Sequence, residues 1–339
     1  MKTRITRRVA LAIIAAGLWV GPSVAWSQAS AQSSAQSPVQ TWPSRPVTII
    51  LPFAAGGGTD LLARALAQDL GERFGQQFVV DNRAGAGGII AAEILAKSPP
   101  DGYTILACTT GNFAIIPYLY KTVPYNADKD LLPVTQSGSL PYIIVVHPSL
   151  PVKNVKELIA FAKSHPGQIN YASSGIGSAS HLSPEMFKSM AGINIVHVPY
   201  KGTGQAIGDL LAGQVVMMFD QPVSTLPHVK AGKLRVLAIT SGKRFPTLQE
   251  IPTVAESGIP GFEAVSWAGV CAPGGTSKDI VNRLQGEVAK VLKLPDVSER
   301  LMRDGIEPIG STPEQFHAFI EREKIKWSKV VKDSGARAD

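Results

Sequence analysis

Short apolar runs alternate with longer amphipathic stretches along most of the chain. Several runs are continuously apolar rather than alternating, which is typical of strands buried on both faces of a parallel sheet. The pattern predicts strands at Val47–Pro52, Gln77–Asp81, Tyr103–Cys108, Tyr142–His147, Gln168–Ala172, Asn194–Val198, Val215–Phe219, Leu234–Thr240 and Ala264–Cys271.

Helices are expected between these strands. Residues 59–74 carry leucines at four-residue spacing, with Thr59 or Asp60 as the expected N-cap and Gly75 as the expected end. Further helices are predicted at Val155–Ser164 with Asn154 as cap, Gly204–Ala212, Lys278–Leu292 and Pro313–Val331, where Thr312 and Gln315 fit a capping box. Strand and helix in alternation predict an α/β fold with mostly parallel sheets.

The chain length favours two lobes, because 339 residues exceed the usual size of one domain. No long linker separates two halves, so the chain is expected to cross between lobes within strands. Tyr142–His147 and Ala264–Cys271 are the best candidates for these crossings. This predicts one lobe from residues 43–143 plus 266–339, and a second lobe from residues 144–265.

The N-terminus has the order of a secretory signal: a cationic stretch with Arg7 and Arg8, an apolar run at 9–20, then small and helix-breaking residues. The apolar run is shorter than the roughly 20 residues of a membrane-spanning helix. We therefore expect a signal peptide at 1–31, cleaved after Ala25 or Ala31, a flexible lead-in at 32–42, and a periplasmic protein. Ordinary secretion and twin-arginine export both stay open.

Charge and cysteine content exclude several classes. The net charge is +7, and the expected signal holds four cations and no acid, so about +3 remains and no dense basic stripe suggests nucleic-acid binding. The two cysteines, Cys108 and Cys271, lie in apolar strand-like runs, so two buried free thiols are favoured over a disulfide. No Cys/His cluster predicts a metal site, and no cofactor is predicted.

The strongest local signal is the glycine-rich turn from Phe53 to Asp60, which joins a predicted buried strand to a helix. In a parallel sheet this turn lies at the carboxyl end of the strand, where ligands bind. Glycines expose backbone N–H groups, and the helix start adds a partial positive charge. The turn therefore suits a carboxylate, although a plain strand–helix turn explains it equally well when it is taken alone.

Other polar turns also follow predicted strands. They are 82–88, Thr109–Asn112, Ser173–Ser178 leading to His181, and Tyr200–Gly204, and Asp220 ends a further strand. Several such turns at the same end of two sheets would surround a cleft with hydroxyl and N–H groups. Nucleotide binding is disfavoured, because the glycine patterns at Gly85 and Gly175 lack the third glycine of the dinucleotide fingerprint.

An exported serine hydrolase that uses Ser178 and His181, with Asp220 available, is the alternative function. It is disfavoured because the chain has no Gly-x-Ser-x-Gly nucleophile elbow.

The motifs, taken in order, resemble the Bug/TctC-type solute receptors of tripartite tricarboxylate transporters. The resemblance covers nearly all of residues 42–335 and rests on Trp42-Pro43-x-Arg45-Pro46, Pro52-Phe53-x-x-Gly56-Gly57-x-x-Asp60, Asn82-Arg83-x-Gly85-Ala86-Gly87-Gly88, Asp101-Gly102-Tyr103-Thr104, Tyr171-x-Ser173-x-Gly175-x-Gly177-Ser178-x-x-His181, Val198-Pro199-Tyr200-Lys201-Gly202 and Pro252-Thr253-x-x-Glu256-x-Gly258. It implies a two-lobed periplasmic binding protein of the Venus-flytrap type, which is not an enzyme and closes on a small mono- or dicarboxylate.

The resemblance and the polar turns together predict the ligand-binding residues. They are Phe53, Ala55, Gly57, Gly58, Thr59, Asp60, Thr110, Asn112, Ser173, Gly175, Gly177, Ser178, His181, Tyr200, Lys201, Gly202 and Asp220. Segments 109–112 and 203–206 depart from the family pattern and are expected to influence ligand choice. The expected partners are membrane transporter subunits or a sensor kinase, not nucleic acid, and the protein is expected to be a monomer.

Overall fold

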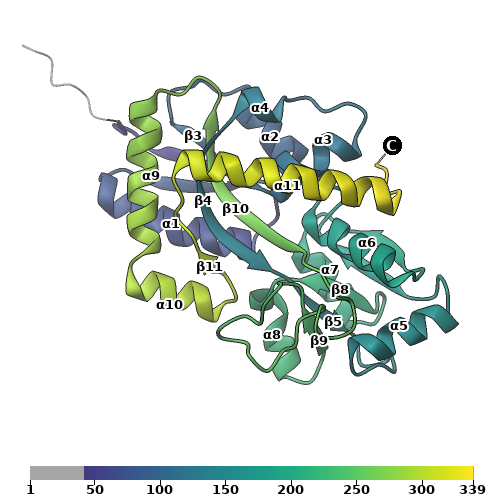
Figure 1. The fold of residues 1–339 in the computed structure, drawn as a ribbon. Helices are drawn as coiled ribbons and strands as arrows, with labels where there is room; N and C mark the ends of the chain where they lie inside the picture. Colours follow the sequence, from purple (N-terminus) through teal and green to yellow (C-terminus); the bar gives the residue numbers. More distant parts are fainter. Residues whose placement is uncertain (1–41, 339) are drawn as a thin grey trace, which may run out of the picture. The chain divides into compact units, whose positions relative to one another are not determined.

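The computed structural model describes residues 42–338, so the predicted signal peptide, its cleavage sites and residues 32–41 of the lead-in lie outside the described residues. Two sheets organise this part of the chain (Figure 1). The strands are β1 (Val47–Leu51), β2 (Phe78–Asn82), β3 (Thr104–Thr109), β4 (Leu131–Pro141), β5 (Ile143–Val146), β6 (Asn170–Ser173), β7 (Val196–Pro199), β8 (Met217–Asp220), β9 (Arg235–Ile239), β10 (Val265–Pro273) and β11 (Glu307–Pro308).

Helices connect these strands and cover the sheets (Figure 1). They are α1 (Gly58–Phe74), α2 (Ile89–Ala96), α3 (Ile116–Leu119), α4 (Ala127–Asp130), α5 (Val155–Ser164), α6 (Ala179–Ala191), α7 (Thr203–Leu211), α8 (Pro222–Lys230), α9 (Lys278–Leu292), α10 (Pro295–Arg303) and α11 (Pro313–Ser334), with short 3-10 and π turns at η1 (Ala86–Gly88) and η2 (Gly111–Ile115). The predicted Asn154 cap and the Thr312–Gln315 capping box are confirmed.

The first sheet has the order β11-β4-β10-β3-β1-β2, and the second has the order β7-β6-β8-β5-β9. The two-lobed α/β class is confirmed, but the sheets are mixed rather than mostly parallel. Strand β1 pairs in parallel with β2 and β3, and β6 pairs in parallel with β7 and β8. The pairs made by β4, β5, β9, β10 and β11 are antiparallel, because these strands do not belong to the strand–helix–strand units.

Strand β4 was not among the predicted strands. Its sequence contains Pro133 and Gly138 and a polar centre of Thr135, Gln136 and Ser137, all poor signals for a buried strand. The strand is nevertheless buried between β10 and β11, and its pairing with β10 is interrupted by register shifts. Pairing with distant strands therefore overrides the local preference of this segment.

The chain passes from the first sheet to the second at Tyr142, which lies between β4 and β5, and returns just before β10. The two passages lie side by side, since Val265 pairs with Pro141. Thr240 ties them together: its backbone N–H donates to the Tyr142 carbonyl at 2.9 Å, and its carbonyl accepts from the Ala264 N–H at 3.0 Å. The lobe boundaries at residues 143/144 and 265/266 stay a prediction.

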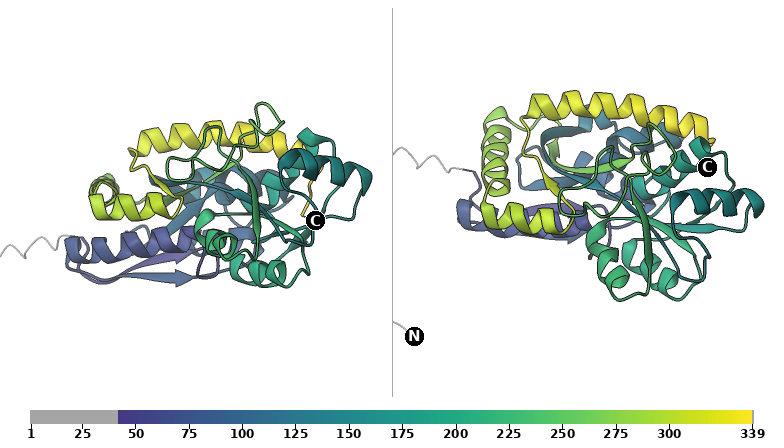
Figure 2. Two further views of the ribbon diagram at one scale, coloured as in Figure 1. Left: turned by 90° about the horizontal axis from the view of Figure 1, so that it is seen from below. Right: turned by 60° about the horizontal axis from the view of Figure 1, so that its bottom comes forward.

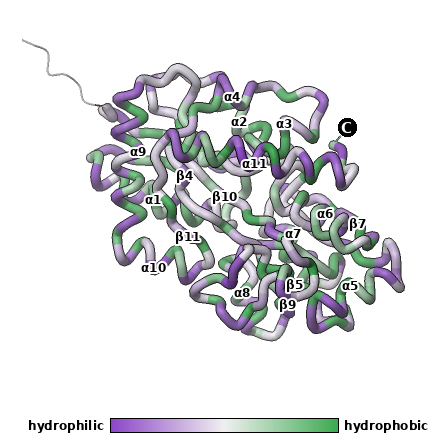
Figure 3. The backbone as a smooth tube through the Cα atoms, viewed as in Figure 1, coloured by the Kyte–Doolittle hydropathy of each residue, from purple (hydrophilic) through white to green (hydrophobic). Residues whose placement is uncertain are grey.

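Both faces of each sheet are covered by buried apolar side chains, which accounts for the continuously apolar strand sequences. The C-terminal helix α11 runs alongside both groups of elements, with α6 near its end (Figures 1 and 2). Phe316 and Ile320 pack in a core of the first sheet, whereas Trp327 packs in a core of the second. Hydrophobic and hydrophilic residues alternate along this helix, as expected for one buried face (Figure 3).

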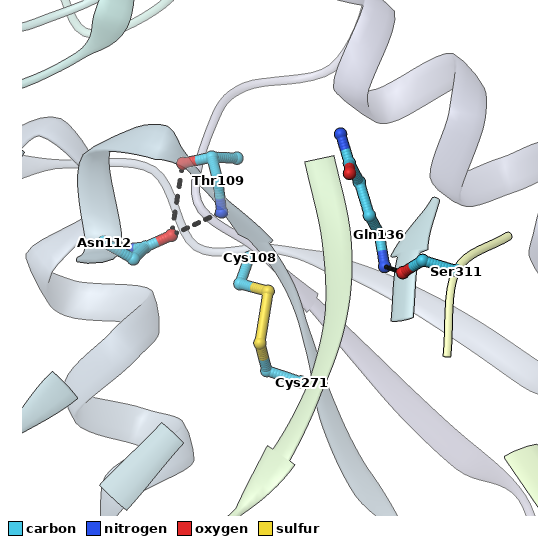
Figure 4. The surroundings of a disulfide bond; sticks show 6 residues. All are labelled: Cys108, Thr109, Asn112, Gln136, Cys271 and Ser311. Atoms are coloured by element: carbon cyan, nitrogen blue, oxygen red, sulfur yellow. Dashed lines mark hydrogen bonds between the residues drawn. A yellow bond between two sulfur atoms is a disulfide. The ribbon is translucent and has the colours of Figure 1, made fainter. Parts of the chain in front are cut away.

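Cys108 and Cys271 form a disulfide, so the expectation of two free thiols is wrong (Figure 4). The bond joins neighbouring antiparallel strands β3 and β10, whose pairing brings the two Cα atoms to 6.0 Å, within the range that a disulfide needs. The cysteines are 163 residues apart, so their spacing gave no sign of this proximity. Cys108 directly precedes Thr109, which is the last residue of β3.

Candidate functional site

A cavity lies where the parallel strands of the two sheets end. It encloses about 490 Å³, including its mouth. The first sheet and the passages between sheets contribute Phe53, Ala54, Gly57, Thr59, Asp60, Thr109, Gly111, Tyr142 and Ser266; the second sheet contributes Ser174, Ala179, Ser180, Thr203, Asp220 and Gln221. The carboxyl ends of β1, β3, β6 and β8 therefore meet at one site, as expected for ligand sites of α/β folds.

Four helices begin at this cavity. Residues at or next to the first turn of α1, α6, α7 and α8 line it: Gly57 and Thr59, Ala179 and Ser180, Thr203, and Gln221. The N-cap residue of α1 is Gly57, so the expected Thr59 or Asp60 cap is wrong. In none of the four helices does the side chain of the N-cap residue accept a hydrogen bond from the first turn, although the Gly58 N–H of α1 donates to Gln221 at the start of α8. Uncapped first turns expose N–H groups and the positive end of the helix dipole, and both favour an anion.

The ionisable side chains that line this cavity are Asp60, Tyr142 and Asp220, and neither lysine nor arginine is among the lining residues. Burial raises the pKa of Tyr142, so this side chain stays neutral. An anion in the cavity would consequently be held by helix ends, backbone N–H groups and hydroxyl groups rather than by a basic side chain.

Asp60 is buried, but its carboxylate is fully used by the protein itself. Oδ2 accepts from the Gly56 N–H at 3.1 Å and from Arg64 Nε at 3.0 Å, while Oδ1 accepts from Asn82 Nδ2 at 3.0 Å. Burial alone would raise the pKa of Asp60, but the hydrogen bonds from Arg64, Asn82 and Gly56 outweigh it and hold the pKa below its usual value. Asp60 therefore fixes the shape of the glycine turn.

Asp220 is also buried, with 2% of its surface exposed, but its carboxyl group is hydrogen-bonded less completely than that of Asp60. Its Oδ2 atom has no hydrogen-bond partner among the described residues. Burial raises the pKa of Asp220 to about 7, and the Gln221 N–H and the hydroxyls of Ser224 and Thr203 offset only part of the effect. Burial therefore favours the protonated form of this carboxyl group, which lines the cavity.

Turns of the two sheets touch one another around the cavity. The Gly58 N–H donates to Gln221 Oε1 at 2.7 Å. Elsewhere the backbones approach so closely that side chains would not fit: a Cβ on Gly202 would lie 2.9 Å from Ala54 Cβ, and one on Gly87, where φ is +62°, would lie 2.0 Å from the Ile176 carbonyl oxygen. Three pairs of turns thus close the site, and two of them require glycine.

A second, wider cavity adjoins the first and shares Phe53 and Ser174 with it. It encloses about 930 Å³, including open space. Its other lining residues are Gly85, Ala86, Gly87, Tyr120, Gly175, Ile176, Pro199, Tyr200, Lys201 and Gln205. Lys201 is exposed, and the rings of Phe53, Tyr120 and Tyr200 line the same cavity.

The structure separates the predicted site residues into three groups. Those that line the inner cavity are Phe53, Gly57, Thr59, Asp60 and Asp220. Those that line the outer cavity are Phe53, Gly175, Tyr200 and Lys201. Those that line neither are Ala55, Gly58, Thr110, Asn112, Ser173, Gly177, Ser178, His181 and Gly202. Direct ligand contact by any of them stays a prediction.

Several members of the third group support residues that do line the cavity. Asn112 Oδ1 accepts from the N–H and the hydroxyl of Thr109 at 2.9 and 3.2 Å (Figure 4). Thr110 Oγ1 accepts from the Trp267 N–H at 3.1 Å. These polar side chains were predicted as ligand contacts because they follow a strand, but their hydrogen-bonding groups point to the protein.

Ser178 and His181 do not form a nucleophile–base pair. The Ser178 hydroxyl donates to the Gly175 carbonyl at 2.7 Å, and His181 Nδ1 accepts from the Gly177 N–H at 3.3 Å. His181 also stacks on His197 at 4.0 Å, and burial lowers the pKa values of the two rings to about 3 and 4. Both side chains therefore hold the turn between β6 and α6, and no observation favours the hydrolase.

The residues missing from the predicted set are Ala54, Thr109, Gly111, Tyr142, Ser174, Ala179, Ser180, Thr203, Gln221 and Ser266. Most lie in turns that the sequence pattern had indicated, one or two positions from the chosen residues. Ser266 had no local signal, because only the assembly of the sheet brings it to the cavity.

Within residues 42–338 no group of histidine, cysteine and acidic side chains is arranged to hold a metal ion. In the same part of the chain no helix has the length and apolar character needed to cross a bilayer.

The chain is similar to one protein family and to several solved structures. Residues 62–336 match the family model described as tripartite tricarboxylate transporter family receptor. The chain is 42% identical to the R. palustris protein Rpa4515, solved with adipate, with a TM-score of 0.85 over 87% of this chain and 99% of that one. It is 38% identical to the periplasmic binding protein BugD, with a TM-score of 0.83 over 88% and 100%. MatC from Rhodopseudomonas palustris, solved with malate, is 33% identical, with a TM-score of 0.81 over 85% and 99%.

Proposed function

Because the chain belongs to the family of tripartite tricarboxylate transporter receptors, we propose that it captures a small mono- or dicarboxylate in the inner cavity for uptake or sensing. One observation carries the proposal most: four uncapped helix N-termini meet at a cavity whose lining contains no lysine or arginine. Such a site attracts a negative charge and offers it N–H donors on several sides.

The binding free energies that are needed favour ligand contacts from both sheets. One helix end contributes on the order of 0.3–2 kcal/mol toward an anion, whereas micromolar affinity needs about 8 kcal/mol. Helix ends from both sheets, the hydroxyl of Thr59 and the exclusion of water add further contributions. We therefore propose that the two lobes, 43–143 with 266–339 and 144–265, close on the ligand.

The two adjoining cavities suggest how a longer ligand lies. Relatives that are 33% and 42% identical were solved with malate and adipate, which differ in length. We propose that one carboxylate occupies the inner cavity in this chain as well, and that the rest of the ligand extends past Phe53 toward Tyr200 and Lys201. The exposed Lys201 ammonium would then favour a second carboxylate.

The likeness to the periplasmic protein BugD supports a periplasmic location, which the N-terminal sequence also indicates. The family description supports a transporter as the partner of the closed, ligand-bound form. A sensor kinase as an alternative partner, and a monomeric state, are further parts of the proposal. Small-angle scattering with and without ligand tests closure, since a closed form has a smaller radius of gyration.

Binding is tested by calorimetry with a panel of succinate, malate, glutarate, adipate and benzoate. Gly58→Ala is the informative variant, because its Cβ would lie 2.6 Å from Gln221 Oε1 and disturb a contact between the sheets. We expect at least one panel member to bind the wild type with micromolar affinity and to bind Gly58→Ala at least tenfold more weakly.

Gly71→Ala is the matched control. It adds the same methyl group to the same helix, α1, where the nearest atom is the Gln76 carbonyl oxygen at 3.6 Å. Affinity equal to wild type is expected. A panel without any binding would contradict the proposed function, and equal weakening by both variants would contradict the role of the Gly58–Gln221 contact.

A further inference from the structure

The inner cavity contains an acidic side chain, Asp220, whose charge the Gln221 N–H and the hydroxyls of Ser224 and Thr203 stabilise only in part. Asp220 ends β8 and lines the cavity with 2% of its surface exposed. Its Oδ2 is buried without a hydrogen-bond partner among the described residues, and no ion pair involving Asp220 is present among them. A buried carboxyl oxygen without a partner is costly, so such a group calls for an explanation.

The surroundings of Asp220 offer no cation to neutralise it. Tyr142 adjoins it from the passage between β4 and β5 and stays protonated, and Ile143 of β5 lies opposite it in the sheet. The ionisable groups on α1, α6 and α7 are already paired or neutral: Asp60 with Arg64, His181, and Asp209 with Tyr200. His228 and Lys230 lie in the last turn of α8, whereas Asp220 precedes the first turn of that helix.

A carboxylate ligand in this cavity would face the Asp220 carboxyl group. Two ionised carboxyl groups in a cavity of low polarity repel each other, whereas a neutral acid donates a short, strong hydrogen bond to a carboxylate. Buried carboxylic acids kept neutral for this purpose are known in other proteins. The burial of Asp220 favours its neutral form before any ligand arrives.

We propose that Asp220 is a protonated hydrogen-bond donor to the captured carboxylate, so that binding takes up a proton at neutral and alkaline pH. The inference rests on the proposed function and assigns a chemical role to one residue of that site. The proton comes from the solvent, resides on Asp220, and is released when the ligand leaves. No covalent bond is formed or broken.

The coupling between proton binding and ligand binding determines the direction and size of the change in affinity with pH. Well below pH 7 the free protein already carries the proton, so Asp220 makes no further contribution to the pH dependence of affinity. Above pH 7 the free protein loses it, and each pH unit weakens binding by up to about tenfold while the complex stays protonated. With a free-protein pKa of about 7, the Kd rises roughly 15-fold between pH 7 and pH 8.5.

The experiment is calorimetry of the full chain with adipate and, separately, malate at pH 7, 7.75 and 8.5. Each titration is run in two buffers whose ionisation enthalpies differ, which reports the number of protons taken up. The wild type is expected to take up between half a proton and one proton and to lose about 15-fold in affinity. Asp220→Asn keeps the shape and retains an N–H donor but cannot titrate, so its Kd should change less than twofold over this range.

Asp279→Asn is the matched control, since it removes an exposed carboxylate from α9, away from the cavity. It should retain the proton uptake of the wild type. Binding without proton uptake, or with the same pH dependence in Asp220→Asn, would overturn this inference and leave the proposed function intact. Absence of binding by both probes, and by the rest of the panel, would overturn both.

Discussion

Two buried aspartates line the same cavity and have opposite environments. Asp60 accepts hydrogen bonds from Gly56, Arg64 and Asn82, and its pKa is held low. Asp220 has an unpartnered oxygen, and its pKa is raised to about 7 by burial. The comparison teaches that residue type and position at a cavity do not decide a role. The partners do: Asp60 is committed to the fold, whereas Asp220 is available to a ligand.

The largest expected effect of this difference is on stability at alkaline pH. Asp220→Asn should raise the free energy of unfolding at pH 8 by up to about 4 kcal/mol, since the raised pKa corresponds to about three pH units at about 1.4 kcal/mol each. The native carboxyl holds its proton while the unfolded one loses it above pH 4, so stability falls between pH 4 and pH 7 in the wild type. Urea unfolding at pH 4 and pH 8 measures this, and an equal difference at both pH values would contradict it.

Asp60→Asn should act in the opposite direction. The amide keeps one acceptor oxygen and replaces the other with an N–H donor, so either Asn82 or both Arg64 and Gly56 lose their acceptor. We expect a loss of about 1–3 kcal/mol in the free energy of unfolding at pH 7. A depressed pKa contributes stability above the unfolded value near 4, and this contribution is lost as the pH falls through the native pKa. Urea unfolding at pH 7 and pH 3 checks both statements. Asp69→Asn, on the same helix, serves as control, and a larger loss for it would refute the role given to Asp60.

The smallest effect is expected for Arg64→Gln. The Arg64 side chain is 49% exposed, so water screens its ion pair with Asp60. A loss of about 0.5–1 kcal/mol is expected, and it should shrink further in 0.5 M salt. Thermal unfolding at two salt concentrations measures this. A loss as large as that of Asp60→Asn, unaffected by salt, would mean that the ion pair rather than the Asn82 and Gly56 hydrogen bonds holds the turn.

The same contrast explains what the sequence could predict. The turn from Phe53 to Asp60, the helices α1, α5, α7, α9 and α11 and the apolar strands depend on local patterns, and their positions were predicted to within a few residues. Family motifs along the chain gave the two-lobed architecture. The polar strand β4 and the disulfide between Cys108 and Cys271 depend on pairing between distant segments, and local patterns carry no information about that pairing.

The sequence predicted which turns form the site, but not the direction in which the side chains of those turns point. Strand ends indicated which turns meet, yet a sequence cannot show whether a polar side chain points to the cavity or to its own turn. Asn112 and Ser178 do not line the cavity, whereas the neighbours to which they bond, Thr109 and Ser180, do; these lie three and two residues away in the sequence. Asp60 and Asp220 were predicted alike, and only the hydrogen-bond partners separate them.

A crystal structure of the protein with the tightest-binding carboxylate of the panel tests the central claim most directly. We expect one carboxylate group in the inner cavity, with oxygens about 2.7–3.2 Å from first-turn N–H groups of helices from both sheets, and one oxygen about 2.5–2.7 Å from Asp220. A ligand held only in the outer cavity, with its carboxylate on Lys201, would contradict it.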